Sequence, residues 1–210
     1  MFWKVEPIRS DSDAERLLVF DSDRSAVEAA RRDPRHFEPL YRKYVGQVYS
    51  FAVYELRDHH SAEDATEQVF LRALSALPRF QERAPDPGGP STFRVWLFQI
   101  ARNVISNERR SRRRHPAEPL AAAISMPASD DPAGIVADRD AAERAWLAVD
   151  RLPEARRRAV ILRFVEEMSP AEIAGVLGRS EGSVRVLIHR ALRAVADELR
   201  GMADAPRKRP

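Results

Sequence analysis

The stretch that decides the fold is SPAEIAGVLGRSEGSVRVLIHR, residues 169–190. It opens with SPAE, residues 169–172, which is a capping box with proline at the first helical position. Gly178 can end this helix, because glycine adopts a left-handed backbone at little cost. Ser180 can then cap a following helix. The stretch therefore predicts two helices joined by a tight turn.

The small residues of this stretch have the spacing of a helix-turn-helix. Ala174 lets the two helices approach closely, Gly178 makes the turn, and Val184 fixes the second helix on the first. In this motif the second helix enters the major groove of DNA. The outward face of that helix carries the residues predicted to bind DNA: Gly182, Ser183, Arg185, Val186, His189, Arg190 and Arg193.

A helical hairpin with a solvated charged face is the alternative interpretation of this pattern. Solvated faces usually mix charges of both signs, whereas residues 182–193 contain no acid. The absence of acids favours a surface for DNA.

Around this motif the pattern predicts a helical unit over residues 140–200, with Val160, Ile161, Phe164, Val165 and Met168 on an inner face. Residues 116–139 precede it, and their four prolines and acidic excess indicate a flexible linker. Residues 201–210 form a basic tail.

A first helical unit is predicted over residues 36–115, preceded by an arm, residues 1–35, with one short helix around residues 24–32. Its helices begin near residues 37, 61 and 92, and a Pro/Gly-rich loop spans residues 81–91. The helical repeat of the first helix is carried by Phe37, Leu40, Tyr41, Tyr44, Val45, Val48, Ala52 and Leu56. No β-alternation is present, so the predicted fold is all-α: two small helical domains and a linker, the C-terminal domain a helix-turn-helix.

The amino-acid composition excludes some classes of function but does not single out one. The 210 residues carry a net charge of +3, and Lys4, Lys43 and Lys208 are the only lysines. Arginine suits phosphate and guanine edges, although codon bias would also enrich it. The chain contains no cysteine, which excludes disulfides and thiolate metal sites. No apolar run has the length of a signal peptide or membrane span, so we expect a cytoplasmic protein without membrane insertion.

The third predicted helix ends in arginines. Residues 102–114 contain six arginines and one acid, the pattern of a phosphate-binding surface. Phe98 is predicted to point outward beside Gln99, Asn103 and Asn107, where it could stack on unpaired bases. The alternative is that Phe98 packs under the preceding loop. Trp96 is expected in the core.

The second predicted helix has a different surface. Glu63, Asp64, Glu67 and Gln68 lie beside Phe70 and Leu71. An acidic face with an apolar rim does not suit DNA and favours a protein partner with basic residues. A merely solvated face is the alternative.

Enzyme signatures are absent from the sequence. It has no Gly-rich phosphate loop, no His-Glu-x-x-His motif and no nucleophile elbow. His59 and His60 are adjacent, so they cannot share one helical face as paired ligands. We expect no catalytic residue, no metal and no cofactor.

The order of these segments resembles one family. LYRKYVGQVYSFA, AEDATEQVFLRAL, FRVWLFQIARNVISNERRSRRR and LPEARRRAVILRFVEEMSPAEIAGVLGRSEGSVRVLIHRALRAV follow each other as in the extracytoplasmic-function (ECF) sigma factors of bacterial RNA polymerase. The resemblance covers roughly residues 36–200. It implies a promoter-specificity subunit, not an enzyme.

The resemblance also implies the role of each surface. The helix-turn-helix would read the promoter −35 element. Contacts with core RNA polymerase would come from Asp64, Glu67, Gln68, Phe70 and Leu71. The −10 element would be bound and melted by Phe98, Gln99, Arg102, Asn103, Asn107, Arg109, Arg110 and Arg113. This chain has Glu67-Gln68 where the family usually has Gln then Glu, and Asn107 where it often has Asp.

The implied partners are core RNA polymerase, promoter DNA and, as a further candidate, an anti-sigma protein. A stand-alone helix-turn-helix regulator is the alternative function, but no dimerisation helix is evident. The placement of the two domains in the free protein stays open, because a flexible linker permits both open and closed arrangements.

Overall fold

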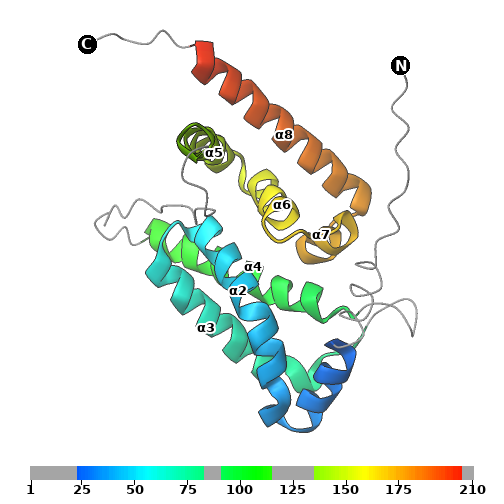
Figure 1. Cartoon of the computed structure of the whole chain (residues 1–210). Coiled ribbons are helices and arrows are strands. Elements are labelled where there is room, and N and C mark those ends of the chain that lie inside the picture. The colour runs from blue at the N-terminus through cyan, green and yellow to red at the C-terminus, as the bar shows by residue number, and fades with distance from the viewer. Residues whose placement is uncertain (1–22, 83–90, 115–134, 205–210) are drawn as a thin grey trace.

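The computed structural model describes residues 23–82, 91–114 and 135–204 (Figure 1). Within these residues all regular secondary structure is helical, which confirms the predicted all-α class. Much of the predicted arm, loop, linker and basic tail lies outside the described residues.

The helices form two groups that pack on each other (Figure 1). In chain order the elements are residues 23–32, η1 (Pro34–Phe37), α2 (Glu38–Leu56), α3 (His59–Ala76), η2 (Leu77–Arg79), α4 (Phe93–Arg114), α5 (Ile135–Asp150), α6 (Glu154–Phe164), α7 (Pro170–Leu177) and α8 (Glu181–Asp204). The first group, through α4, is called the N-terminal unit below. The second group, α5 to α8, is called the C-terminal unit. The two groups meet where α7 lies on α4 and α6 on α2.

Local signals set the helix ends, in places away from the predicted position. Asp58 is the N-cap of α3 and accepts a hydrogen bond from the Ser61 backbone at 2.9 Å. The predicted start at Ser61 is therefore wrong, because Asp58, directly before the histidine pair, caps the helix earlier. Similarly, α5 begins at Ile135, inside the segment predicted as linker.

A glutamate anchors the start of α4. The Glu82 carboxylate accepts hydrogen bonds from the Thr92 backbone at 2.6 Å and from Ser91 Oγ at 2.7 Å. Burial alone would raise the pKa of Glu82, but these hydrogen bonds lower it. The unpaired backbone donors at the beginning of a helix favour such a carboxylate.

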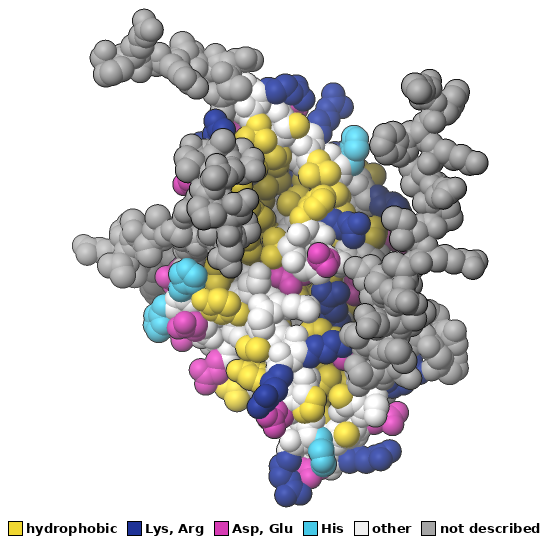
Figure 2. Space-filling model, in the orientation of Figure 1, with side chains coloured by type: hydrophobic (Ala, Val, Ile, Leu, Met, Phe, Trp, Pro, Cys, Tyr) yellow, Lys and Arg dark blue, Asp and Glu magenta, His cyan; other side chains and the backbone are white. Residues whose placement is uncertain are grey.

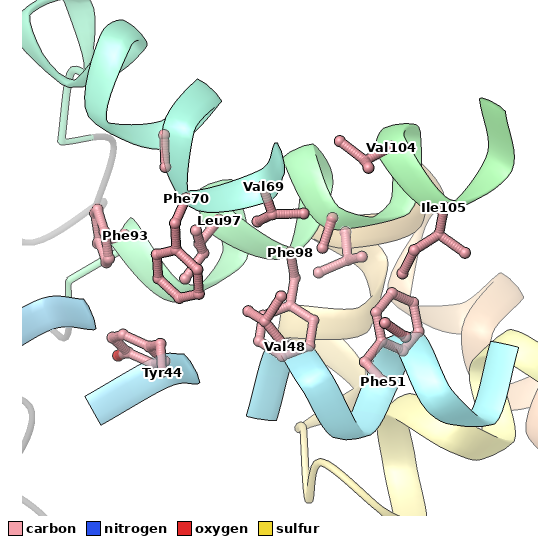
Figure 3. Close-up of a cluster of buried hydrophobic side chains, with 14 of the residues drawn as sticks. Tyr44, Val48, Phe51, Val69, Phe70, Phe93, Leu97, Phe98, Val104 and Ile105 are labelled. Atoms are coloured by element: carbon pink, nitrogen blue, oxygen red, sulfur yellow. The ribbon is translucent and has the colours of Figure 1, made fainter. Parts of the chain in front are cut away.

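The N-terminal unit has a dense aromatic core (Figure 3). Its buried side chains include Tyr44, Val48, Phe51, Val69, Phe70, Phe93, Leu97, Phe98, Val104 and Ile105. Tyr41 was expected in this core and is instead 44% exposed, with its ring 4.8 Å from Phe70 at the margin. Trp96, expected in the core, is half-buried at its margin and packs on Phe80 and Phe93.

The helix of residues 23–32 belongs to the same core. Val27 and Ala30 are buried, and the Asp23 carboxylate accepts hydrogen bonds from Lys43, at 2.6 Å, and from the Tyr44 hydroxyl. The predicted arm therefore ends in a packed helix.

One hydrophobic cluster runs through both units. Ile161, Leu162, Met168, Ile173 and Val176 are buried in the same cluster as the core residues of α2 and α4. A second, smaller cluster joins α5, α6 and α8 around Val149 and Ala191. Phe164 was expected on the inner face but is 54% exposed, because α6 ends there and the chain turns away.

Candidate functional site

The turn between α7 and α8 has the predicted geometry. The Glu172 backbone donates to Ser169 Oγ at 3.2 Å, and the Ser169 backbone donates to the Glu172 carboxylate at 2.8 Å, which completes the capping box. Gly178 closes α7 with a φ of 64°, and Ser180 caps α8. Val184 is fully buried beneath the turn. The helix-turn-helix is thus held by the residues that predicted it.

The outer face of α8 presents the seven predicted residues together. Ser183 is half-buried, and the other six are exposed: Gly182, Arg185, Val186, His189, Arg190 and Arg193. Arg185 forms an ion pair with Glu181 one turn earlier. An exposed pair of this kind is weak, so the guanidinium can change partners readily. The face is thus open to solvent on the outside of the helix-turn-helix.

Helix α4 carries two polar stripes. The first, here called the covered stripe, consists of Gln99, Arg102, Ser106 and Arg109 and lies toward the C-terminal unit. The second, called the open stripe, consists of Asn103, Asn107, Arg110 and Arg114 and is exposed. The predicted −10 surface included residues of both stripes.

Phe98 is not on either stripe. Its side chain is fully buried, its ring centroid is 5.6 Å from that of Phe51, and the Arg94 guanidinium lies over its ring at 5.9 Å. The predicted outward stacking position is therefore wrong. Phe98 sits beside Leu97 at the edge of the apolar stripe, and Phe51 of α2 extends the core far enough to include it (Figure 3).

The arginines of α4 do not act as one group. Arg109 pairs with Glu55 at 2.9 Å, and Arg112 binds Asp58 and Ser61. Hydrogen bonds from Ser61, together with Arg112, lower the pKa of Asp58 to about 2. The side chain of Arg113 lies outside the described residues. Among the described side chains of the predicted phosphate-binding run, Arg110 and Arg114 are exposed at the surface.

An apolar groove with an acidic rim lies on the surface between α2 and α3. It measures about 540 Å³ and is lined by Phe37, Tyr41, Val45, Tyr49, Glu63, Thr66, Glu67, Phe70, Leu71 and Leu74. Acidic side chains lie beside hydrophobic ones over these helices in Figure 2. Asp64, Glu67, Gln68 and Leu71 are exposed as predicted, whereas Phe70 is buried and contributes to the floor of the groove.

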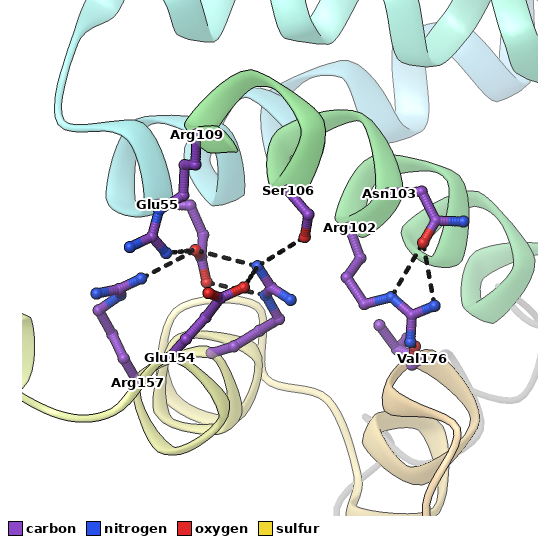
Figure 4. A network of polar contacts seen from close by, with 9 residues as sticks. Glu55, Arg102, Asn103, Ser106, Arg109, Glu154, Arg157 and Val176 are labelled. Carbon is purple, nitrogen blue, oxygen red and sulfur yellow. Dashed lines mark hydrogen bonds and ion pairs between the residues drawn. The ribbon is translucent and has the colours of Figure 1, made fainter. Parts of the chain in front are cut away.

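A buried carboxylate joins the two units (Figure 4). Glu55 has a fully buried side chain, and it accepts hydrogen bonds from Arg158 at 3.1 Å and from Arg109 at 2.9 Å. Arg157 adds a contact of 3.4 Å. Arg158 also donates to Ser106 of the covered stripe at 3.2 Å. Opposite charges from α2, α4 and α6 are thus paired inside the molecule, as buried charges require.

Sequence inspection missed Glu55 and its arginines, although a signal was present. Glu55 stands between Ala52 and Leu56 on the apolar face of its helix, where a charge is costly unless it is paired. Arg157 and Arg158 stand in the same way before Val160 and Ile161. A charge at a core-facing position indicates a buried partner elsewhere in the chain.

Among the described residues, no group of three or more His, Cys, Asp or Glu gathers as a metal site. None of the helices described is long and apolar enough to cross a membrane.

The sequence matches two family models in the order of the two units. Sigma-70 region 2 matches residues 40–115, and Sigma-70, region 4 matches residues 142–195. The chain belongs to the ECF sigma factors of RNA polymerase. An ECF sigma factor directs RNA polymerase to promoters, as a transcription initiation factor that has no catalytic role.

Known sigma factors resemble the chain over most of its length. RNA polymerase sigma-H factor of Pseudomonas aeruginosa is 30% identical over 85% of this chain and 94% of its own. ECF RNA polymerase sigma factor BldN of Streptomyces coelicolor is 30% identical over 89% of this chain and 67% of its own. The solved structure of CnrH in complex with the cytosolic domain of CnrY covers 87% of this sigma factor and 99% of that chain, with a TM-score of 0.61 and 26% identity.

Proposed function

We propose that this sigma factor reads the −35 element with the outer face of α8, binds and melts the −10 element with α4, and docks on core RNA polymerase through α3. It acts in the cytoplasm and catalyses no reaction itself. The observation that carries the proposal is the outer face of α8, which presents arginines and a histidine at the groove-entering position of a helix-turn-helix, with no acid among residues 182–193.

Both stripes of α4 support the −10 assignment. Asn103 and Asn107 offer amide groups that can bind the edges of unpaired bases, and Arg110 and Arg114 offer charges for phosphates. Gln99 and Arg102 of the covered stripe would extend this surface along one side of the helix.

The α2–α3 groove supports the docking assignment. Its apolar floor would take hydrophobic side chains from a helix of the polymerase, and Asp64 and Glu67 at its rim would attract basic residues beside them. The residues within 36–115 and 140–200 would then act as the two functional domains, with residues 116–139 between them. An anti-sigma protein is a further proposed partner, since the sigma factor CnrH is known in complex with CnrY.

Two substitution sets test the proposal in reconstituted transcription with core polymerase. Arg190→Ala should lower affinity for the cognate −35 sequence by about 1–3 kcal/mol if Arg190 contacts a base through two hydrogen bonds. Arg200→Ala, at an exposed arginine of the last turns of α8, is the matched control. Equal loss on cognate and mutated −35 sequences would contradict base recognition by Arg190.

Reversing Asp64 and Glu67 to Lys should abolish binding to core polymerase, because like charges at an interface cost several kcal/mol. The matched control reverses Glu28 and Asp197, two exposed acids outside the groove. Retained polymerase binding by the Asp64/Glu67 variant would place the docking surface elsewhere.

A further inference from the structure

A polar cavity of about 390 Å³ lies where α2, α4, α5 and α6 meet. Its charged lining consists of four arginines, Arg57, Arg109, Arg112 and Arg157, and two acids, Glu55 and Asp150. Cavities of about 300–1,000 Å³ have the size that holds a small-molecule ligand. Because the arginines outnumber the acids, the charge of the lining favours an anion.

The cavity has a buried end and an open end. At the buried end the Glu55 side chain is fully buried, and the side chain of Arg157 is only 9% exposed. At the open end the side chains of Arg57 and Arg112 are 30% and 41% exposed. A small anion can therefore enter beside two accessible arginines and approach a third that is held inside the molecule.

Arg157 is only weakly paired at the buried end. Its Nη2 lies 3.4 Å from Glu55 Oε2, which also accepts a hydrogen bond from Arg109 at 2.9 Å (Figure 4). Arg158 binds the same carboxylate and has Glu154 as a second partner. Within the part of the chain that the structure describes, Arg157 Nε is buried without a hydrogen-bond partner. One carboxylate thus serves three guanidiniums, whereas a buried charge is costly unless it is fully paired.

The arginines at the open end are held in place by acids. Arg57 binds both oxygens of Asp150, with its Nε at 3.0 Å, and Arg112 binds Asp58 and lies 3.5 Å from Glu108. A guanidinium carries five N–H donors, and Asp150 takes only two of those of Arg57. Arg57 can therefore keep Asp150 and bind an anion as well. Side chains that are already fixed lose less freedom when a ligand binds.

We propose that this cavity binds a small phosphate-bearing anion, with Arg157 and Arg109 at its inner end and Arg57 and Arg112 at its entrance. A guanidinium matches two phosphate oxygens with a pair of hydrogen bonds. A phosphate group carries close to two negative charges at neutral pH, which equals the excess of four arginines over two acids. It would supply the counter-charge that Arg157 lacks. The site does not depend on the proposed promoter contacts of α8, and its test requires neither polymerase nor a promoter.

Calorimetric titration and thermal melting of the full chain test the site. The probes are inorganic phosphate, pyrophosphate and AMP at constant ionic strength, with succinate as a dianion that lacks phosphate. We expect the phosphate-bearing probes to bind one site saturably and to raise the melting temperature, as a ligand of the folded chain does. Tighter binding of AMP than of the inorganic probes would identify nucleotides as the source of the phosphate, and the reverse order would identify inorganic phosphates.

Two substitutions test the two ends of the cavity. Arg157→Gln and Arg57→Gln should each lower the affinity for pyrophosphate by about tenfold or more, because each removes charge-assisted hydrogen bonds. The matched control is Arg42→Gln, which removes an exposed arginine of α2 that pairs with Glu38 outside the cavity and should leave the affinity unchanged. If the melting curve shows that Arg157→Gln does not fold, the partly exposed Arg57 decides the test.

Absence of saturable binding for all three phosphate-bearing probes would overturn the proposal. Equal binding of succinate would also overturn it, since the cavity would then recognise charge and not phosphate. An equal loss of affinity in Arg42→Gln and in the cavity variants would show that pyrophosphate binds to the overall charge of the chain. Displacement of pyrophosphate by a short single-stranded DNA, at far lower concentration and through the same arginines, would assign the cavity to a nucleic-acid backbone instead of a small ligand.

Discussion

At the scale of single residues, Glu166 is an unusual group, a buried carboxyl with one unpaired oxygen. It follows α6, packs against α2 of the other unit with a hydrogen bond to Ser50, and leaves Oε1 without a hydrogen-bond partner. Burial raises the pKa of Glu166 to about 7, although Ser50 and Arg94 oppose this shift. Between about pH 4.5 and pH 7, the folded chain therefore keeps a proton on Glu166 that the unfolded chain would release.

This residue predicts a pH dependence of stability. Because the folded pKa is above the unfolded value, the stabilising effect of the proton is complete below about pH 4.5 and is lost as the pH rises to about 7. Glu166→Gln removes the titration. Its unfolding free energy, relative to the natural chain, should therefore increase by about 2–3 kcal/mol between pH 5 and pH 8, as measured by urea denaturation. A constant difference across this range would show that Glu166 stays ionised in the folded chain.

Residues also show where sequence inspection succeeds. The capping box at Ser169, the left-handed Gly178 and the buried Val184 were predicted because each signal lies within a few residues of its effect. Phe98 was misplaced because its burial depends on Phe51, 47 positions earlier in the chain. Local chemistry identifies turns and caps, whereas a distant partner decides which edge of a helix is covered.

At the scale of helices, α4 shows that an apolar stripe in the sequence does not reveal every buried face of a helix. The pattern predicted one buried side and one free side. In the structure α4 packs on α2 and α3 through apolar residues, and on α7 through both apolar and polar ones. Gln99 and Arg102 bind backbone carbonyls of α7. Their residue types alone do not predict such a contact, because the same side chains are common on solvent-exposed faces.

The two kinds of arginine on α4 lead to a prediction about DNA binding. Arg110 and Arg114 are exposed, so replacing both with Gln should remove about two phosphate contacts. The slope of log affinity against log salt should then become shallower by about 1.8, at unchanged thermal stability. Filter binding or anisotropy over a salt series measures the slope.

Arg112 is the matched control for this experiment. It binds Asp58 and Ser61 at the start of α3, so Arg112→Gln should lower the melting temperature and leave the salt slope nearly unchanged. A salt slope that falls equally for Arg112→Gln and for the Arg110/Arg114 variant would contradict this division of the arginines.

At the scale of the whole molecule, the order of the units was predictable but their packing was not. The resemblance and the composition of residues 116–139 indicated two units and a linker, which is compatible with any relative placement. The packing depends on Glu55 meeting Arg157 and Arg158, and on Gly175 meeting Val95. The members of each pair are far apart in sequence, so the hydrophobic periodicity of single helices cannot predict that they meet.

The shared core predicts how the chain unfolds. Ile161, Met168 and Ile173 of the C-terminal unit are buried in one cluster with the core of α2 and α4, so neither unit can unfold without exposing apolar surface of the other. Calorimetry of the natural chain should therefore show one transition, with equal calorimetric and van't Hoff enthalpies.

Gly175→Gln should divide this transition into two. Glutamine is a good helix former, so α7 keeps or gains stability, but its side chain cannot fit against Val95. Gly46→Ala is the matched control: it replaces an exposed helical glycine of α2 that has open space around it, and it should add about 0.5–1 kcal/mol of stability while the single transition persists. If Gly175→Gln also unfolds in one transition, the units do not depend on the α4–α7 contact for their cooperativity. Two transitions would show that this contact, made possible by one glycine, unites the two halves of the free sigma factor.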